Sequence, residues 1–196
     1  MNKQTIFAIA IVILLIGGVF FLSRSPEQAQ HSGHLANTAL AAKFEELSQS
    51  GNSSCSATFK ESILAMSDDA RLKGSCCSSM SIPRYTEQVE GLQKFKSKPG
   101  QNISEITDDP YDIEAGLAKR LISYYDIELT LEEQAAYDYA MLNSSEKGPC
   151  CCKCWRWYVY GGLAKFLIQN HGFTGEQITE LWDLSDGCGG DTEGHH

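Results

Sequence analysis

The stretch GPCCCKCWRW, residues 148–157, constrains this chain more than any other feature. Four of the eight cysteines fall within five positions there, behind Pro149 and ahead of two tryptophans. Adjacent cysteines form disulfides only with strain. A cysteine triplet followed by a fourth thiol is therefore poorly suited to disulfide bonding and well suited to binding a soft metal ion. The other four cysteines are Cys55, Cys76, Cys77 and Cys188.

The cysteine-rich stretch is expected just before the N-terminus of a helix. Pro149 discourages the preceding helix from continuing, and the apolar segment 155–171 must begin its helix close by. The free N–H groups and positive dipole end of a helix stabilise thiolates. Once the helix has started, Cys151 and Cys154 share one face of it.

The predicted metal ligands are Cys150, Cys151, Cys152 and Cys154, completed by Cys188 and then by Cys76 and Cys77. Thiolate-rich sites favour Cu(I), Zn(II), Hg(II) or an iron–sulfur cluster. Cu(I) and Hg(II) need the fewest ligands and tolerate the crowded spacing best, whereas Zn(II) prefers a tetrahedron. Helices 155–171 and 174–184 are joined by a short turn, so antiparallel packing would return Cys188 to the first four.

Two other functions remain open from the sequence. Cys151 and Cys154 form a C-x-x-C pair that suits a thiol–disulfide oxidoreductase, although no thioredoxin-like βαβ pattern surrounds it. The cysteines can also serve as staples of an interaction module without chemistry of its own, and a structural partner is expected for Cys55. No hydrolase, metalloprotease, P-loop or dinucleotide signature is present, so an enzyme is the less favoured expectation.

The N-terminus predicts a single membrane anchor, residues 1–24. Residues 4–23 are 20 uncharged positions, enough for a helix of about 30 Å, the thickness of the bilayer core. A cleaved signal peptide is the alternative, but its apolar part is usually shorter. The remaining chain holds all 25 acidic residues and all but two of the 16 Lys and Arg, a net formal charge of −11. We expect this acidic part on the extracytoplasmic side, as a single-pass membrane protein that binds no nucleic acid.

The rest of the sequence predicts an all-α, compact helical bundle behind a polar tether, residues 25–35. Within the cysteine-rich domain, residues 36–196, apolar residues recur at helical spacing. Capping boxes begin two of the helices, at Thr130 with Glu133 and at Thr174 with Gln177. The expected helices cover residues 36–50, 56–73, 83–95, 110–127, 130–142, 155–171 and 174–184.

Residues 135–154, AAYDYAMLNSSEKGPCCCKC, resemble the bacterial PCYCGC-motif proteins, which are exported and cysteine-rich. The resemblance lies in Tyr139 and Ala140 before the break and in Pro149, Cys150, Cys152 and Cys154, a P-C-x-C-x-C frame. Cys151 and Lys153 stand where that family has an aromatic residue and a glycine, and WRW replaces its Gly-His. The resemblance implies export and a thiol-based metal site. Separately, a metal transporter or a redox protein is the expected partner of a metal-binding protein at a membrane.

Overall fold

A computed structural model describes residues 26–50, 55–56 and 58–189. The chain divides into two compact units, residues 1–42 and 43–196. The predicted anchor, residues 1–24, lies outside the described residues, and none of the described helices has the length and apolar character needed to cross a bilayer. Residues 26–35, in the predicted tether, are helical, and their role as a tether stays a prediction.

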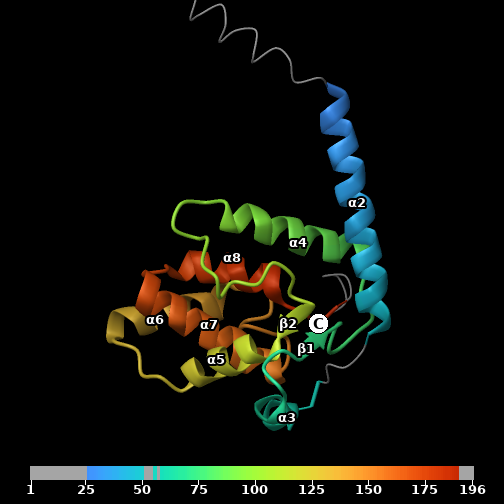
Figure 1. Cartoon of the computed structure of the whole chain (residues 1–196). Coiled ribbons are helices and arrows are strands. Elements are labelled where there is room, and N and C mark those ends of the chain that lie inside the picture. The colour runs from blue at the N-terminus through green and yellow to red at the C-terminus, as the bar shows by residue number, and fades with distance from the viewer. Residues whose placement is uncertain (1–25, 51–54, 57, 190–196) are drawn as a thin grey trace, which may run out of the picture. The chain divides into compact units, whose positions relative to one another are not determined.

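The described residues are mostly helical, as the sequence predicts, and they include one small antiparallel sheet that it does not (Figure 1). In chain order the elements are α2 (Pro26–Gln49), α3 (Phe59–Ala65), β1 (Arg71–Lys73), α4 (Ile82–Lys96), β2 (Asp112–Glu114), α5 (Ala115–Tyr125), α6 (Leu131–Asn143), α7 (Trp155–His171) and α8 (Gly175–Ser185).

Helices α5 and α7 make the most extensive helix–helix contact of the second unit. Two glycines of α7 allow this close approach. A Cβ on Gly162 would lie 1.8 Å from the carbonyl oxygen of Leu121, and one on Gly161 would lie 2.9 Å from the ring of Tyr125. Such distances exclude any larger side chain, which explains why α7 tolerates two residues of low helix propensity.

Helix α8 packs against α6 and α4 (Figure 1). The indole of Trp182 on α8 meets the ring of Tyr137 edge-on at 5.5 Å and donates to the carbonyl oxygen of Tyr160 at 3.1 Å. The capping boxes predicted for α6 and α8 are both present. Gly172 ends α7 in the left-handed conformation, with φ of 64°, as a C-terminal glycine should.

The two strands occupy residues that the sequence analysis assigned to two helices. The helix predicted over 56–73 is shorter, because α3 ends at Ala65 and residues 71–73 pair with residues 112–114 in register Leu72 to Ile113. The helix predicted over 110–127 begins only at Ala115. The first amides of α5, those of Ala115 and Gly116, bond to the carbonyl oxygens of Ala70 and Asp68 at 2.8 and 2.9 Å. Tertiary pairing therefore overrides the local helical pattern.

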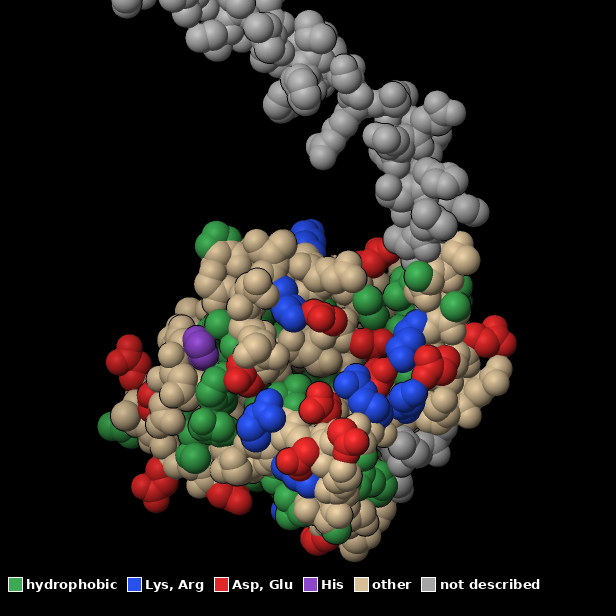
Figure 2. Space-filling view, in the orientation of Figure 1, with side chains coloured by type: hydrophobic (Ala, Val, Ile, Leu, Met, Phe, Trp, Pro, Cys, Tyr) green, Lys and Arg blue, Asp and Glu red, His purple; other side chains and the backbone are tan. Residues whose placement is uncertain are grey.

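The last two turns of α2 belong to the second unit. Leu47 is buried, and the Phe44 ring lies 5.7 Å from that of Tyr85 on α4. Lys43 Nζ forms an ion pair with Asp112 on β2 at 2.8 Å. Figure 2 shows basic and acidic side chains interspersed on this face of the molecule. These contacts secure the sheet, and β1 leads directly into the loop that carries Cys76 and Cys77.

Candidate metal centre

Four separate segments bring the eight cysteines together. Cys55 precedes α3, Cys76 and Cys77 follow β1, residues 150–154 connect α6 to α7, and Cys188 follows α8. All eight thiols are free. We call this group the cysteine cluster.

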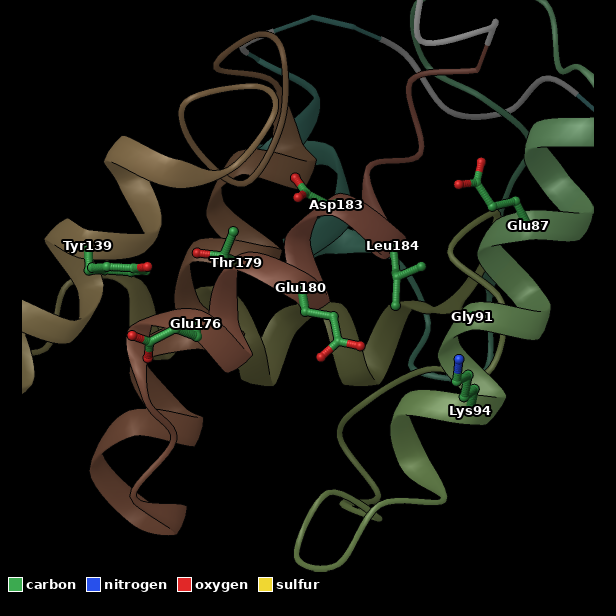
Figure 3. A pocket seen from close by; sticks show the side chains of 9 residues that line it. All are labelled: Glu87, Gly91, Lys94, Tyr139, Glu176, Thr179, Glu180, Asp183 and Leu184. Carbon is green, nitrogen blue, oxygen red and sulfur yellow. The ribbon is translucent and has the colours of Figure 1, made fainter.

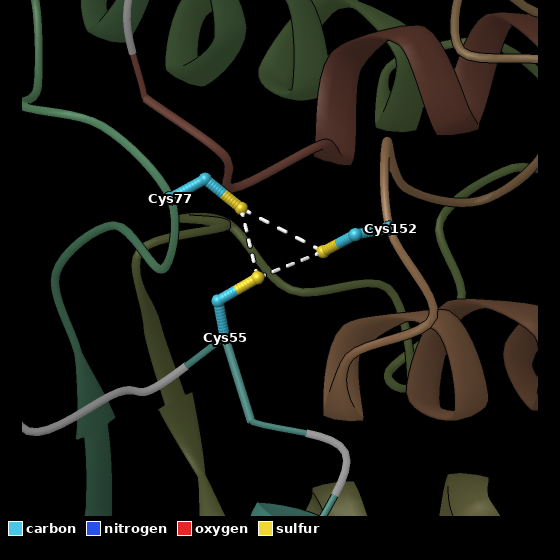
Figure 4. Close-up of side chains that lie close together, drawn as sticks. All are labelled: Cys55, Cys77 and Cys152. Atoms are coloured by element: carbon cyan, nitrogen blue, oxygen red, sulfur yellow. Dashed lines mark hydrogen bonds between the residues drawn. The ribbon is translucent and has the colours of Figure 1, made fainter.

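Three of the sulfurs form a closed outer triangle. The Sγ of Cys55 lies 3.0 Å from that of Cys152 and 3.3 Å from that of Cys77, and the third side, Cys77 to Cys152, is 3.6 Å (Figure 4). Cys55 and Cys77 are exposed, and Cys152 is half-buried. We call these three residues the outer triad, and solvent reaches it directly.

Four other sulfurs form a buried group beneath. Cys150, Cys154 and Cys188 are at most 1% exposed. The Sγ of Cys150 lies 3.2 Å from that of Cys188 and 3.8 Å from that of Cys154. Cys76 is 3.9 Å from Cys154 and within 4.8 Å of both Cys150 and Cys188. We call Cys76, Cys150, Cys154 and Cys188 the inner tetrad.

The remaining cysteine, Cys151, connects the two groups. Its Sγ lies 3.0 Å from that of Cys188 in the inner tetrad and 3.7 Å from that of Cys77 in the outer triad. A second connection is the 3.6 Å contact between the neighbours Cys76 and Cys77. The eight sulfurs therefore form one continuous network.

Backbone hydrogen bonds align the loops that carry the inner tetrad. The amide of Cys76 donates to the carbonyl oxygen of Gly187 at 3.2 Å, and the amide of Ser78 donates to that of Cys188 at 2.9 Å. Gly189 follows with φ of 79°, and a Cβ there would lie 2.5 Å from the carbonyl oxygen of Ser78. The two loops thus run close together because glycine leaves room for the backbone.

The 150–154 segment is shaped by its flanking turns. Ser144 Oγ accepts from the amide of Gly148 at 2.8 Å and donates to its carbonyl oxygen at 3.2 Å. Cys154 is the N-cap residue of α7. The sequence prediction that residues 150–154 lie just before a helix N-terminus is confirmed.

A buried guanidinium lies beside the inner tetrad. Arg156 is fully buried and forms no ion pair with any carboxylate of the described residues. It donates to the carbonyl oxygens of Pro110 and Gly74, and its Nε has no hydrogen-bond partner there. A Cβ on Gly187 would lie 2.2 Å from its Cζ, which places the guanidinium against the residue before Cys188.

The thiols and Arg156 shift one another's protonation. Burial by itself would lower the pKa of Arg156, but nearby Tyr160, Cys76 and Cys150 raise it on balance. Hydrogen bonds from Cys150, Cys154 and Cys188 lower the pKa of Cys76, and the charge of Arg156 adds to this. A buried cation without a carboxylate partner requires a nearby anion, and the thiolate of Cys76 is placed to supply it.

Cys151 is the second thiol whose pKa is lowered. Hydrogen bonds, first from Cys150 and then from Cys188 and Cys77, lower the pKa of Cys151 to about 5. Burial is the main cause that raises the pKa of Cys77 and of Cys152. The connecting cysteine therefore combines exposure to solvent with a lowered pKa.

The structure brings together all seven cysteines predicted as ligands. The predicted return of Cys188 to the 150–154 segment is confirmed by its 3.2 Å contact with Cys150. Sequence reasoning missed Cys55 as a member of the cluster and missed Arg156. The even cysteine count and the arginine enclosed by tryptophans in WRW were the available signals.

A hollow of about 520 Å³ lies elsewhere, between α4, α6 and α8 (Figure 3). Its lining includes four carboxylates, those of Glu87, Glu176, Glu180 and Asp183, and no cysteine. Three of these carboxylates already have partners, because Glu87 pairs with Arg84, Glu180 pairs with Lys98, and Asp183 accepts from the amide of Ser145. The hollow is thus separate from the cysteine cluster.

Comparison with known proteins gives no match to a family model, a curated protein or a solved structure. No family match accompanies the resemblance of residues 135–154 to PCYCGC-motif proteins. The eight clustered cysteines, at distances compatible with metal binding or a redox role, are what the chain itself offers as a functional site.

Proposed function

We propose that the cysteine cluster is a soft-metal centre that binds Cu(I) or Hg(II) in preference to Zn(II). The observation that carries this proposal is the contact network of eight free sulfurs from four chain segments. Soft thiolate ligands select such ions, and four segments far apart in the sequence bring their sulfur atoms into contact here.

The sulfur spacing supports single ions held between thiolates. An ion with four metal–sulfur bonds of about 2.3 Å separates its ligands by about 3.8 Å, and one with three separates them by about 4.0 Å. The sulfur–sulfur contacts of the cluster, 3.0 to 3.9 Å, need only a small outward movement to reach those values. An iron–sulfur cluster would need its irons and inorganic sulfides between sulfurs that are now in contact, so it fits less well.

Charge balance also supports thiolate chemistry. Arg156 is buried beside the inner tetrad, and no carboxylate within the described part of the chain pairs with it. Metal-bound thiolates carry net negative charge when their number exceeds the charge of the ion, as with four sulfurs on one Cu(I) or Hg(II). The guanidinium offsets part of that charge where water cannot, because the effective dielectric constant is low in the interior.

The proposed role is sequestration, delivery or sensing of the metal at the outer face of a membrane. The uncharged stretch 4–23 supports the membrane attachment, and the acidic remainder supports the extracytoplasmic position. In that compartment thiols oxidise readily, and a bound metal ion protects them. A metal transporter or a redox protein is the expected partner.

The experiment is metal analysis of the full-length chain purified anaerobically, combined with titration of free thiols. The wild type is compared with Cys150→Ser/Cys152→Ser/Cys154→Ser. Leu131→Ser, at a position 94% exposed on α6, is the control for an apolar-to-serine change. We expect stoichiometric metal in the wild type and control and its loss in the triple variant, with circular dichroism used to check that helices persist.

The identity of the ion comes from the same samples, after growth or reconstitution with Cu(I), Hg(II) or Zn(II). Stoichiometric retention of Zn(II) alone would contradict the proposed preference. A wild-type protein without metal and with every thiol oxidised would overturn the proposal and leave disulfide staples as the function of the cluster.

A thiol–disulfide oxidoreductase is the second candidate, because Cys151 is exposed and its pKa is lowered to about 5. The Sγ of Cys151 lies 3.0 Å from that of Cys188, which could act as the resolving thiol. The geometry thus favours Cys188 over Cys154 as resolving thiol. A reversible two-electron titration that disappears in Cys151→Ser would support this function, and a single irreversible oxidation would oppose it.

A further inference from the structure

We propose that the cluster is two metal sites in series: the exposed outer triad receives an ion, the buried inner tetrad retains an ion, and Cys151 passes it between them. This inference rests on the proposed metal-binding function and adds an order of events to it. It predicts more than one bound ion for each chain and different exchange rates for the two.

The outer triad has the features of an entry site. Its three sulfurs form a closed triangle, which suits a three-coordinate soft ion, and Cys55 and Cys77 are exposed (Figure 4). A partner or small chelator can therefore reach an ion there and exchange ligands with it.

The inner tetrad has the features of a retention site. Three of its four sulfurs are at most 1% exposed, and the guanidinium of Arg156 supplies a buried positive charge beside it. Cys76 and Cys150 are each within 4.8 Å of the other three tetrad sulfurs. An ion there is shielded from chelators, and its thiolate charge is offset within the protein.

The connection between the sites runs through sulfur. Cys151 Sγ lies 3.7 Å from Cys77 and 3.0 Å from Cys188, so a metal–sulfur bond to Cys151 can form before a bond in the outer triad breaks. Each transfer exchanges one metal–sulfur bond for another. The protons of the inner thiols pass to the outer thiolates that are released, and the oxidation state of the ion does not change.

The test uses the full-length chain titrated anaerobically with Cu(I), followed by native mass spectrometry. The loaded protein is then challenged with an excess of a chromogenic Cu(I) chelator. We expect at least two ions in the wild type and a biphasic extraction whose fast phase is at least tenfold faster than its slow phase.

The decisive variant is Cys55→Ser/Cys77→Ser, because both residues are exposed and the change leaves the inner tetrad complete. We expect it to lose one ion and the fast phase, to keep the slow phase, and to load its remaining ion at least tenfold more slowly. Ser79→Ala, exposed in the same loop, is the matched control and should behave as the wild type. Cys151→Ser should slow loading with little change in final occupancy of the inner site.

The outcomes separate this inference from the proposed function. Cu(I) binding that is monophasic in the wild type and lost as a whole in the outer variant would overturn the two-site inference while metal binding stands. Unchanged loading kinetics in both variants would overturn the transfer order. No binding of Cu(I), Hg(II) or Zn(II) by the wild type would overturn both.

Discussion

The helical body and the cysteine loops of this protein are held by different forces. The body, helices α5 to α8, is closed by buried apolar side chains and by glycines that bring backbones into contact. The segments that carry the cysteine cluster, residues 55–56, 74–81, 148–154 and 186–189, rest on a few backbone hydrogen bonds and on sulfur contacts. We infer that the body folds without metal. The loops, in contrast, need the bound metal ion to reach their final ordered conformation.

The largest expected effect is on the body. In Gly162→Ala the new Cβ would meet the Leu121 carbonyl oxygen at 1.8 Å, so α5 and α7 must separate. We expect a loss of at least about 3 kcal/mol in unfolding free energy, measured by chemical denaturation of the metal-free protein.

The matched control is Gly172→Ala, where a Cβ meets nothing within 4 Å but φ is +64°. Backbone strain alone should cost about 1–2 kcal/mol there. If Gly162→Ala cost no more than this control, close packing of α5 on α7 would not be what holds the body together.

The loops should respond more strongly to pH than the body does. Hydrogen bonds from neighbouring thiols raise the pKa of Cys150. A hydrogen bond from Cys150 lowers the pKa of Cys154 and of Cys188, but Cys76 and burial outweigh it, so that both values are raised on balance. These three thiols therefore tend to stay protonated in the metal-free protein at neutral pH. Metal binding must displace their protons, and affinity therefore rises with pH. With about three protons released for an ion in the inner tetrad, the dissociation constant falls by up to about 1,000-fold for each pH unit.

Calorimetry of Zn(II) binding in buffers of different ionisation enthalpy counts these protons. Cys76 should contribute none, because hydrogen bonds from its neighbours and Arg156 lower its pKa. An affinity that is flat between pH 6 and 8 would mean that the thiols are already ionised before metal arrives.

Arg156 lies between the body and the loops, and its removal should weaken metal binding by about 100-fold. In Arg156→Met the apolar stem is kept while the buried charge next to the thiolates is lost. The loss of stability should be greater for the metal-loaded protein than for the metal-free one, since only the former has the full thiolate charge to offset.

Arg156→Lys, which keeps the charge, should restore part of the affinity, and Arg120→Met, on the exposed face of α5, should change nothing. Competition with a chromogenic chelator measures all three. Equal affinity for the methionine and lysine variants would assign Arg156 a packing role instead of an electrostatic one.

The same division explains what the sequence could predict. The body was predictable because its signals are local: helical spacing, two capping boxes and a terminal glycine for α7. The strands were not, because three residues are too few to show alternation, and their pairing joins residues 71–73 to 112–114. The lengths of α7 and α8 were enough to place Cys188 near residues 150–154. Nothing local placed Cys55, and nothing local showed that Arg156 is buried with no carboxylate partner among the described residues.

The smallest expected effect is the most direct test of whether body and loops are independent. Thr130 Oγ1 accepts from the amide of Glu133 at the start of α6, the end farther along the helix from the cysteines. Thr130→Ala removes that cap and should cost about 1 kcal/mol of unfolding free energy.

Metal affinity should stay the same in Thr130→Ala, because the loops meet the body at the other end of α6, where Ser144 holds the turn before Cys150. Ser144→Ala, which removes the turn contacts instead, should lower metal affinity by a similar free energy. A cap mutation that weakened metal binding as much as the turn mutation would show that the two regions fold as one unit, and the cysteine loops would then be preformed by the body rather than ordered by the metal.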